Sequence, residues 1–80
     1  MNATKSKVAR AFGEALRMAR KEAGLSQEAL ALQSGIDRTF VSMLERGIRQ
    51  PALSTVFALS AVLSVTPGKL VEQAARLLGR

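Results

Sequence analysis

Residues 27–47 read QEALALQSGIDRTFVSMLERG, and this stretch decides the fold. Its first half is helical in character and carries the small residue Ala31, which lets a second helix approach closely. Gly35 follows in the connection, where glycine adopts the positive φ that a tight turn requires. Val41 and Leu44 then lie one turn apart on the next segment, so both point to one face. The pattern predicts two helices that cross steeply over a short turn.

Helical periodicity and capping residues extend this prediction to the rest of the chain. An apolar stripe with helical spacing precedes residue 24, and no segment alternates with the period of two that a strand requires. Residues that cap helix N-termini stand before four segments, at Ser26, Asp37, Ser54 and Thr66. We therefore expect an all-α single domain over residues 1–80, with helices near residues 8–23, 27–33, 38–46, 55–63 and 67–78.

Composition argues against several classes of function. The 80 residues include neither cysteine nor histidine, so the chain offers no disulfide, no thiolate ligand and no imidazole base. Its six carboxylates are scattered along the sequence. We expect no enzymatic activity, no metal, no cofactor and no small-molecule ligand.

Charge points to a polyanionic partner. Twelve Lys and Arg against six Asp and Glu give a net charge of +6, which suits nucleic acid or an anionic membrane surface. The longest uncharged stretch, residues 50–68, contains three Ser, two Thr and two Pro and is too polar to span a bilayer. The polar N-terminus is not followed by the apolar core of a signal peptide. We expect no membrane partner and a cytoplasmic location.

The second helix of the quoted stretch has an outer face of a different character. If Val41 and Leu44 face inward, four side chains project outward at helical spacing. An α-helix is about 10–12 Å wide and fits the major groove of DNA, where such side chains reach base edges. The candidate base-reading residues are Arg38, Thr39, Ser42 and Met43.

Several motif residues occur together at one spacing. They are Gly13, Leu16, Arg17, Arg20, residues 24–28, Leu30, Ala31, Gly35, Ile36, residues 37–42, residues 44–47, Pro51 and residues 65–67. On these residues the stretch from Phe12 to Leu70 resembles the Cro/C1-type (XRE-like) helix-turn-helix family. That family includes phage repressors, restriction-modification controller proteins and antitoxins. The resemblance implies a five-helix, lambda-repressor-like domain whose helix-turn-helix is formed by the second and third helices.

The resemblance implies roles for the reading helix and the helix before it. Gln27 would contact a DNA phosphate at the start of the second helix, unless it is simply exposed. Arg38 would bind guanine O6 and N7, or else clamp a phosphate without reading sequence. Thr39 would contact a thymine methyl or a phosphate. Ser42 can donate or accept a hydrogen bond and would therefore tolerate more than one base. Met43 stands at a position where the family often has a polar residue. It would pack on thymine methyls or point into the contact between the second and third helices.

Four further residues are expected at the DNA backbone: Phe40, Arg46, Arg49 and Gln50. Phe40 would either contact the DNA, at the sugar-phosphate backbone or a base, or cover the core beside Leu44. The other three fall in the loop after the reading helix, where cations supply salt-dependent affinity or form a solvated basic loop. We also expect residues 1–6 to form a flexible basic arm, with Lys5 and Lys7 running along the DNA or in a frayed tail.

Arg20 and Glu45 have a structural role in the family, where the matching residues form a partly buried ion pair between the first and third helices. We expect the same pair here. A buried pair that loses one partner costs about 3–5 kcal/mol, whereas two exposed charges contribute about 1 kcal/mol or less.

The family resemblance also implies self-association. Family members place two reading helices in successive major grooves, about 34 Å apart on a near-palindromic site. We expect the fifth helix, residues 66–78, to supply the dimer surface, because its apolar stripe is broader than a small domain needs for its own core; the alternative is that the stripe packs inside one protomer. The stripe comprises Leu70, Val71, Ala74, Leu77 and Leu78.

The resulting hypothesis is a transcriptional regulator that binds an operator in double-stranded DNA as a homodimer. It would act as a repressor or autoregulator, as restriction-modification controllers and phage repressors do. The alternative is an antitoxin that neutralises a protein toxin and regulates its own operon. A protein-interaction module that no longer reads DNA is a third class.

Overall fold

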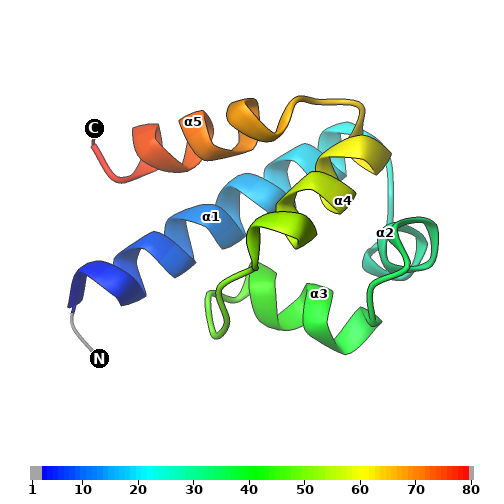
Figure 1. Cartoon of the computed structure of the whole chain (residues 1–80), viewed down its shortest axis with the longest axis horizontal. Coiled ribbons are helices and arrows are strands. Elements are labelled where there is room, and N and C mark those ends of the chain that lie inside the picture. Colours follow the sequence, from blue (N-terminus) through cyan, green and yellow to red (C-terminus); the bar gives the residue numbers. More distant parts are fainter. Residues whose placement is uncertain (1–2, 80) are drawn as a thin grey trace.

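The fold is all-α across residues 3–79, the part of the chain that the computed structural model describes. These residues form five helices and no strand: α1 (Ala3–Glu22), α2 (Gln27–Ser34), α3 (Arg38–Glu45), α4 (Leu53–Leu63) and α5 (Pro67–Leu77). The predicted fold class is therefore confirmed. The helices α1 and α5 run side by side in opposite directions, while α2 and α3 meet at the other side of α4 (Figure 1).

The core lies where these helices meet and draws on every one of them. Six large side chains that are at most 1% exposed occupy it: Leu16, Leu30, Val41, Leu44, Leu59 and Leu70. A second set, partly buried, packs around this centre and includes Leu25, Ile36 and Phe40. Because α3 contributes both Val41 and Leu44 to the core, the orientation of α3 is determined by packing.

Two of the predicted caps are confirmed by hydrogen bonds. The hydroxyl oxygen of Ser26 accepts from the backbone N–H of Ala29 at 3.0 Å, and Thr66 accepts from the N–H of Lys69 at 3.0 Å. Asp37 occupies the N-cap position of α3, but its side chain makes no capping hydrogen bond.

The predicted start of α4 is wrong by two residues. The helix begins at Leu53 after Ala52, so Ser54 lies inside the first turn instead of capping it. The backbone N–H groups of Thr55 and Val56 already donate to the carbonyl of Ala52, at 3.0 and 3.2 Å. The chain enters the helix from extended backbone directly after Pro51, which leaves no place for a side-chain cap at position 54.

The first helix begins earlier than predicted. Residues 3–6 belong to the helix, residues 1 and 2 lie outside the described residues, and the flexibility of the expected arm stays a prediction. The early turn is tied to the loop after α3, because the side-chain amide of Gln50 donates to the carbonyl of Lys5 at 3.3 Å. Ala9, one turn further on, is already buried.

A glycine contact fixes the crossing of α1 and α3. A Cβ atom at Gly13 would stand 2.7 Å from the carbonyl oxygen of Glu45 and closer still to that of Leu44. One turn earlier, the backbone of Arg10 lies against Gly47, which has a φ of 75°. The C-terminal end of α3 therefore rests directly on the backbone of α1.

No single helix within residues 3–79 is long and apolar enough to cross a membrane. The helices α4 and α5 meet the criterion of length and composition only when taken together, and they are bent by 103° at the break between them.

Candidate nucleic-acid interface

Packing divides α3 into an inner and an outer face. Val41 and Leu44 are fully buried, which turns the opposite side of the helix to solvent. Arg38 and Thr39 are exposed at the start of the helix, and Ser42 and Met43 are partly exposed further along. The four candidate base-reading residues thus lie on one accessible face, as the sequence predicts, and their contacts with bases remain a prediction.

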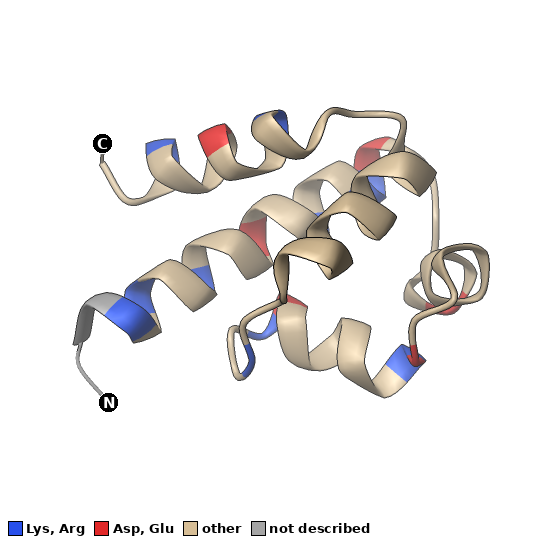
Figure 2. Cartoon of the chain, in the orientation of Figure 1, with Lys and Arg blue, Asp and Glu red and all other residues tan. Residues whose placement is uncertain are grey.

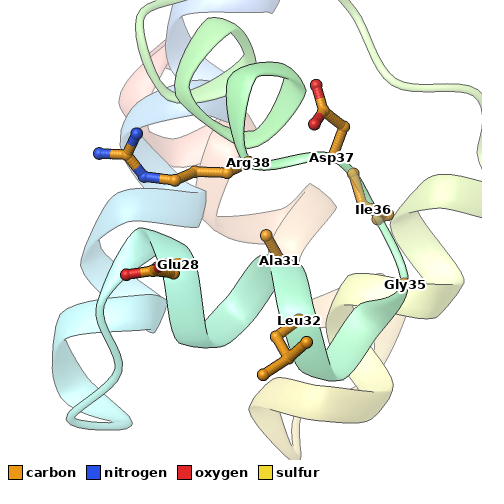
Figure 3. Close-up of a pocket in the computed structure, with 7 residues that line it drawn as sticks. All are labelled: Glu28, Ala31, Leu32, Gly35, Ile36, Asp37 and Arg38. Carbon is orange, nitrogen blue, oxygen red and sulfur yellow. The ribbon is translucent and has the colours of Figure 1, made fainter.

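The side chain of Arg38 stands at the edge of an open depression of about 400 Å³ between α2 and α3 (Figure 3). Arg38 and Glu28 extend from their helices toward the same side, whereas Leu32 points away from α3 (Figure 3). Within residues 3–79 the Arg38 guanidinium has no hydrogen-bond or ion-pair partner. A guanidinium without a partner keeps all its donors for a ligand.

The predicted ion pair between Arg20 and Glu45 is present. The Nε atom of Arg20 lies 2.6 Å from Oε2 of Glu45, and Nη2 lies 3.0 Å from Oε1. The two side chains are only 11% and 3% exposed, so the pair is shielded from water. The hydrogen bonds to Glu45 raise the pKa of Arg20, against an opposing effect of burial. Arg20 is therefore held in its charged form.

Two more hydrogen bonds extend this pair to the start of α2. Nη1 of Arg20 donates to the carbonyl of Leu25 at 2.8 Å, and the amide Nε2 of Gln27 donates to Oε1 of Glu45 at 3.0 Å. The link between Gln27 and Glu45 is absent from the sequence-based expectations. We call the three side chains Arg20, Gln27 and Glu45 the anchor network. It joins the end of α1, the start of α2 and the end of α3.

Besides Gln27, the family resemblance implies four residues at the DNA backbone, and the structure places these four in different surroundings. Phe40 is partly buried and packs against the core, which is the second of its two expected positions. Arg46 is exposed, and its Nε atom donates to the carbonyl of Ser42 at 3.4 Å. Arg49 is exposed, and Gln50 is tied to α1. The loop therefore presents cations to solvent, while Phe40 serves the fold.

Basic residues occur on several elements, including the start of α1 and the loop after α3. A pocket of about 380 Å³ between the start of α1 and the loop after α3 is lined by Lys5, Arg49 and Gln50, among others. Figure 2 shows further blue segments at the start of α3 and along α1, whereas α4 is tan along its whole length. Arg38 thus stands at the start of α3 and Arg46 and Arg49 follow its end, whereas α4 carries no charged residue.

The expectation of a dimer surface along α5 is wrong for part of the stripe. Leu70 and Ala74 are 1% and 7% exposed and belong to the core of the protomer, because α5 packs along α1. Leu78 packs partly against the same core. Only Val71 and Leu77 are about half exposed.

The sequence-based expectations missed two exposed apolar residues on α4. Leu53 is 71% exposed and Phe57 is 56% exposed, one turn apart. The sequence does indicate this exposure, because α4 has no charged residue on any face, and packing inside one protomer covers only one face of a helix.

These features define a class. A two-helix elbow that buries one face of its second helix, and turns a polar face that begins at an arginine outward, has the form of a helix-turn-helix. The family model for the helix-turn-helix, HTH_3, matches residues 16–70. The chain belongs to this family.

Individual relatives agree with the assignment. The control protein C.MunI of Mycoplasma sp is 42% identical over 60 residues, which cover 74% of this chain and 81% of the relative. The crystal structure of the restriction-modification controller protein C.AhdI from Aeromonas hydrophila is 42% identical, with a TM-score of 0.76 and coverage of 78% and 94%. The structure of SinR, a master regulator for biofilm formation, in complex with DNA is 31% identical, with a TM-score of 0.73 and coverage of 75% and 97%.

The described residues offer no group of three or more His, Cys, Asp or Glu side chains that could hold a metal ion.

Proposed function

We propose that this chain is a transcriptional regulator that binds a specific site in double-stranded DNA, with α3 as its reading helix. The observation that carries the proposal is the division of α3 into a core-facing side at Val41 and Leu44 and an accessible side that begins at Arg38. The relatives described above are controller proteins and a master regulator, which favours a regulator over an antitoxin. A repressor or autoregulator of the controller type is the form we favour, acting in the cytoplasm on the nucleoid.

Sequence reading and affinity would come from different residues. Arg38, whose guanidinium has no partner within residues 3–79, would bind guanine bidentately and discriminate against other bases by about 1–3 kcal/mol. Thr39, Ser42 and Met43 would make smaller contributions along the same groove. Arg46 and Arg49 would bind phosphates, which strengthens binding to every sequence and makes it salt-dependent.

The functional unit in this proposal is a homodimer. One small domain reads few bases, and two copies on a near-palindromic site double the contacts. The exposed side chains of Leu53 and Phe57 on the uncharged helix α4 support an interface there, with Val71 and Leu77 of α5 as further candidates.

DNA selection tests the reading role. The wild-type protein should select one half-site, in two inverted copies, from a random pool of duplexes. Arg38→Ala should then bind operator variants at one base pair with nearly equal affinity, while weak nonspecific binding persists. Arg76→Ala is the matched control, since Arg76 is exposed on α5 away from the elbow. An equal loss of affinity on all sequences would show that Arg38 contacts only phosphate.

Sedimentation tests the dimer. Phe57→Glu places a charge on the apolar face of α4 and should shift the protein to monomer. Leu32→Glu is the control, because Leu32 is 83% exposed on α2 and lies outside the proposed interface. A dimer that survives Phe57→Glu unchanged excludes α4 as the interface.

A further inference from the structure

The carboxylate of Glu45 accepts hydrogen bonds from two different side chains. Arg20 occupies Oε2 through Nε and Oε1 through Nη2, at 2.6 and 3.0 Å. Gln27 donates to Oε1 as well, at 3.0 Å. An ion pair alone needs no third side chain, so the amide of Gln27 is an additional feature of this site.

The contact fixes which way the Gln27 amide points. A glutamine side chain carries one acceptor oxygen and one NH2 group with two donors. If the amide were flipped, its oxygen would face the carboxylate and two acceptors would meet. The NH2 group must therefore point to Glu45, and Arg20 holds that carboxylate in place from the other side.

One donor of Gln27 remains after this bond is made. Gln27 is the first residue of α2, and the first hydrogen bond of that helix is donated by Leu30 to the carbonyl of Ser26. The backbone N–H groups ahead of Leu30 are therefore available for other acceptors, apart from that of Ala29, which Ser26 caps. A partly exposed amide N–H and backbone N–H groups at one helix start suit a single phosphate.

We propose that Glu45, held by Arg20, is a positioning residue that orients the Gln27 amide to donate its remaining N–H to one DNA phosphate. The inference rests on the proposed DNA-binding function and adds a role for Glu45 to the structural one. The anchor network then serves two purposes at once: it joins three helices, and it prepares a phosphate contact before DNA arrives. Preparing the donor in advance removes part of the ordering cost of binding.

The test combines protein variants with neutralised phosphates. Each phosphate of the selected operator is replaced in turn by an uncharged methylphosphonate, and binding is measured for wild type, Gln27→Ala and Glu45→Asp. For wild type, one phosphate in each half-site should cost about tenfold in affinity, the lower limit for a hydrogen bond to a charged group. Gln27→Ala should lose most of that sensitivity, because only the backbone N–H groups at the start of α2 remain to bind the phosphate. Glu45→Asp should lose it too, because the shortened carboxylate withdraws from Gln27 while its charge still faces Arg20.

A purely structural role gives a different result. In that case Glu45→Asp lowers affinity for all operators alike and keeps the tenfold sensitivity at the same phosphate, which overturns the proposal. The proposal is also overturned if every methylphosphonate lowers the affinity of wild type and of Gln27→Ala to the same extent. Glu72→Asp is the matched control, because Glu72 is an exposed residue of α5 that faces Arg76 at 3.8 Å.

Spin relaxation of side-chain amides in the free wild-type protein provides a second readout that needs no variant. Gln27 should be as rigid as the backbone, whereas Gln33, exposed on the same helix, should be mobile. Equal mobility of the two amides overturns the proposal. Failure of the wild type to select any DNA site contradicts the proposed function itself. If the wild type selects a site but the phosphate effect does not depend on Gln27 and Glu45, only the proposed role of Glu45 is contradicted.

Discussion

Replacing Gly13 by alanine tests the close crossing of α1 and α3. Alanine is favoured over glycine inside a helix by about 1 kcal/mol, so the change would stabilise an isolated α1. In the folded protein the new Cβ atom would stand 2.7 Å from the carbonyl oxygen of Glu45 and closer to that of Leu44. Both neighbours are backbone atoms, and neither can rotate away as a side chain can. The helices must therefore separate. The cost of this separation determines whether the substitution lowers or raises the free energy of unfolding.

The magnitude follows from two costs. Forcing extra atoms into a packed site costs about 1–3 kcal/mol, and occasionally more. Moving the end of α3 also disturbs the bonds between Glu45 and Arg20, and a broken buried pair costs about 3–5 kcal/mol. After the gain in helix propensity of about 1 kcal/mol is subtracted from the sum of these two costs, we expect Gly13→Ala to lower the free energy of unfolding by about 3–7 kcal/mol, the upper figure applying if the pair breaks completely. Domains of this size have about 5–15 kcal/mol in total, so the loss is large.

Urea unfolding followed by circular dichroism measures this loss, at one fixed protein concentration because self-association affects the midpoint. Gly68→Ala is the matched control. A Cβ atom there would find its nearest atom, the hydroxyl oxygen of Thr66, at 4.0 Å, so stability should be unchanged or raised by up to about 1 kcal/mol. A Gly13→Ala protein as stable as wild type would refute the crossing geometry.

Two further predictions concern the buried pair and the caps. Arg20→Met should lower the free energy of unfolding by about 3–5 kcal/mol and Arg17→Met, in a half-exposed pair, by less than about 1 kcal/mol; equal midpoints in urea would contradict this. Because the pKa of Arg20 is raised on folding, its contribution is complete below the pKa of the unfolded guanidinium and is lost only as pH rises through the higher folded value. The effect of Arg20→Met should therefore be the same at neutral and at moderately alkaline pH, and a decline over that range would exclude the charged pair. Ser26→Ala and Thr66→Ala should each cost about 1 kcal/mol, whereas Ser54→Ala should stay within about 0.5 kcal/mol, since only the first two cap a helix; three similar losses in thermal or urea melts would argue otherwise.

The fold was predictable from sequence where the signals are local. The turn glycine at Gly35, with a φ of 73°, and the buried pair Val41 and Leu44 each appear as expected. The start of α4 was misjudged because Ser54 is a good cap by type, and only the backbone bonds to Ala52 show that the helix has already begun.

The site was less predictable because its decisive contacts are distant in sequence. The apolar stripe of α5 correctly indicated burial, but sequence does not say what covers a stripe, and Leu70 packs within its own protomer. The ion pair of Arg20 and Glu45 was expected only from the family resemblance. The bond between Gln27 and Glu45 joins residues 18 positions apart and depends on how two helices cross. Residue type and spacing carry no signal for such a bond.

The helix α3 is fixed at one end and exposed at the other. Glu45 and the crossing at Gly13 hold the last turn of α3, while Arg38 and Thr39 stand in its first turn, outside the core. Substitutions at exposed positions usually change stability by no more than about 0.5 kcal/mol. Under the proposed function, mutations in the first turn should therefore alter the preferred operator while the protein remains folded. In that case a few substitutions in one turn of α3 are enough to change the DNA target without a compensating change in the core.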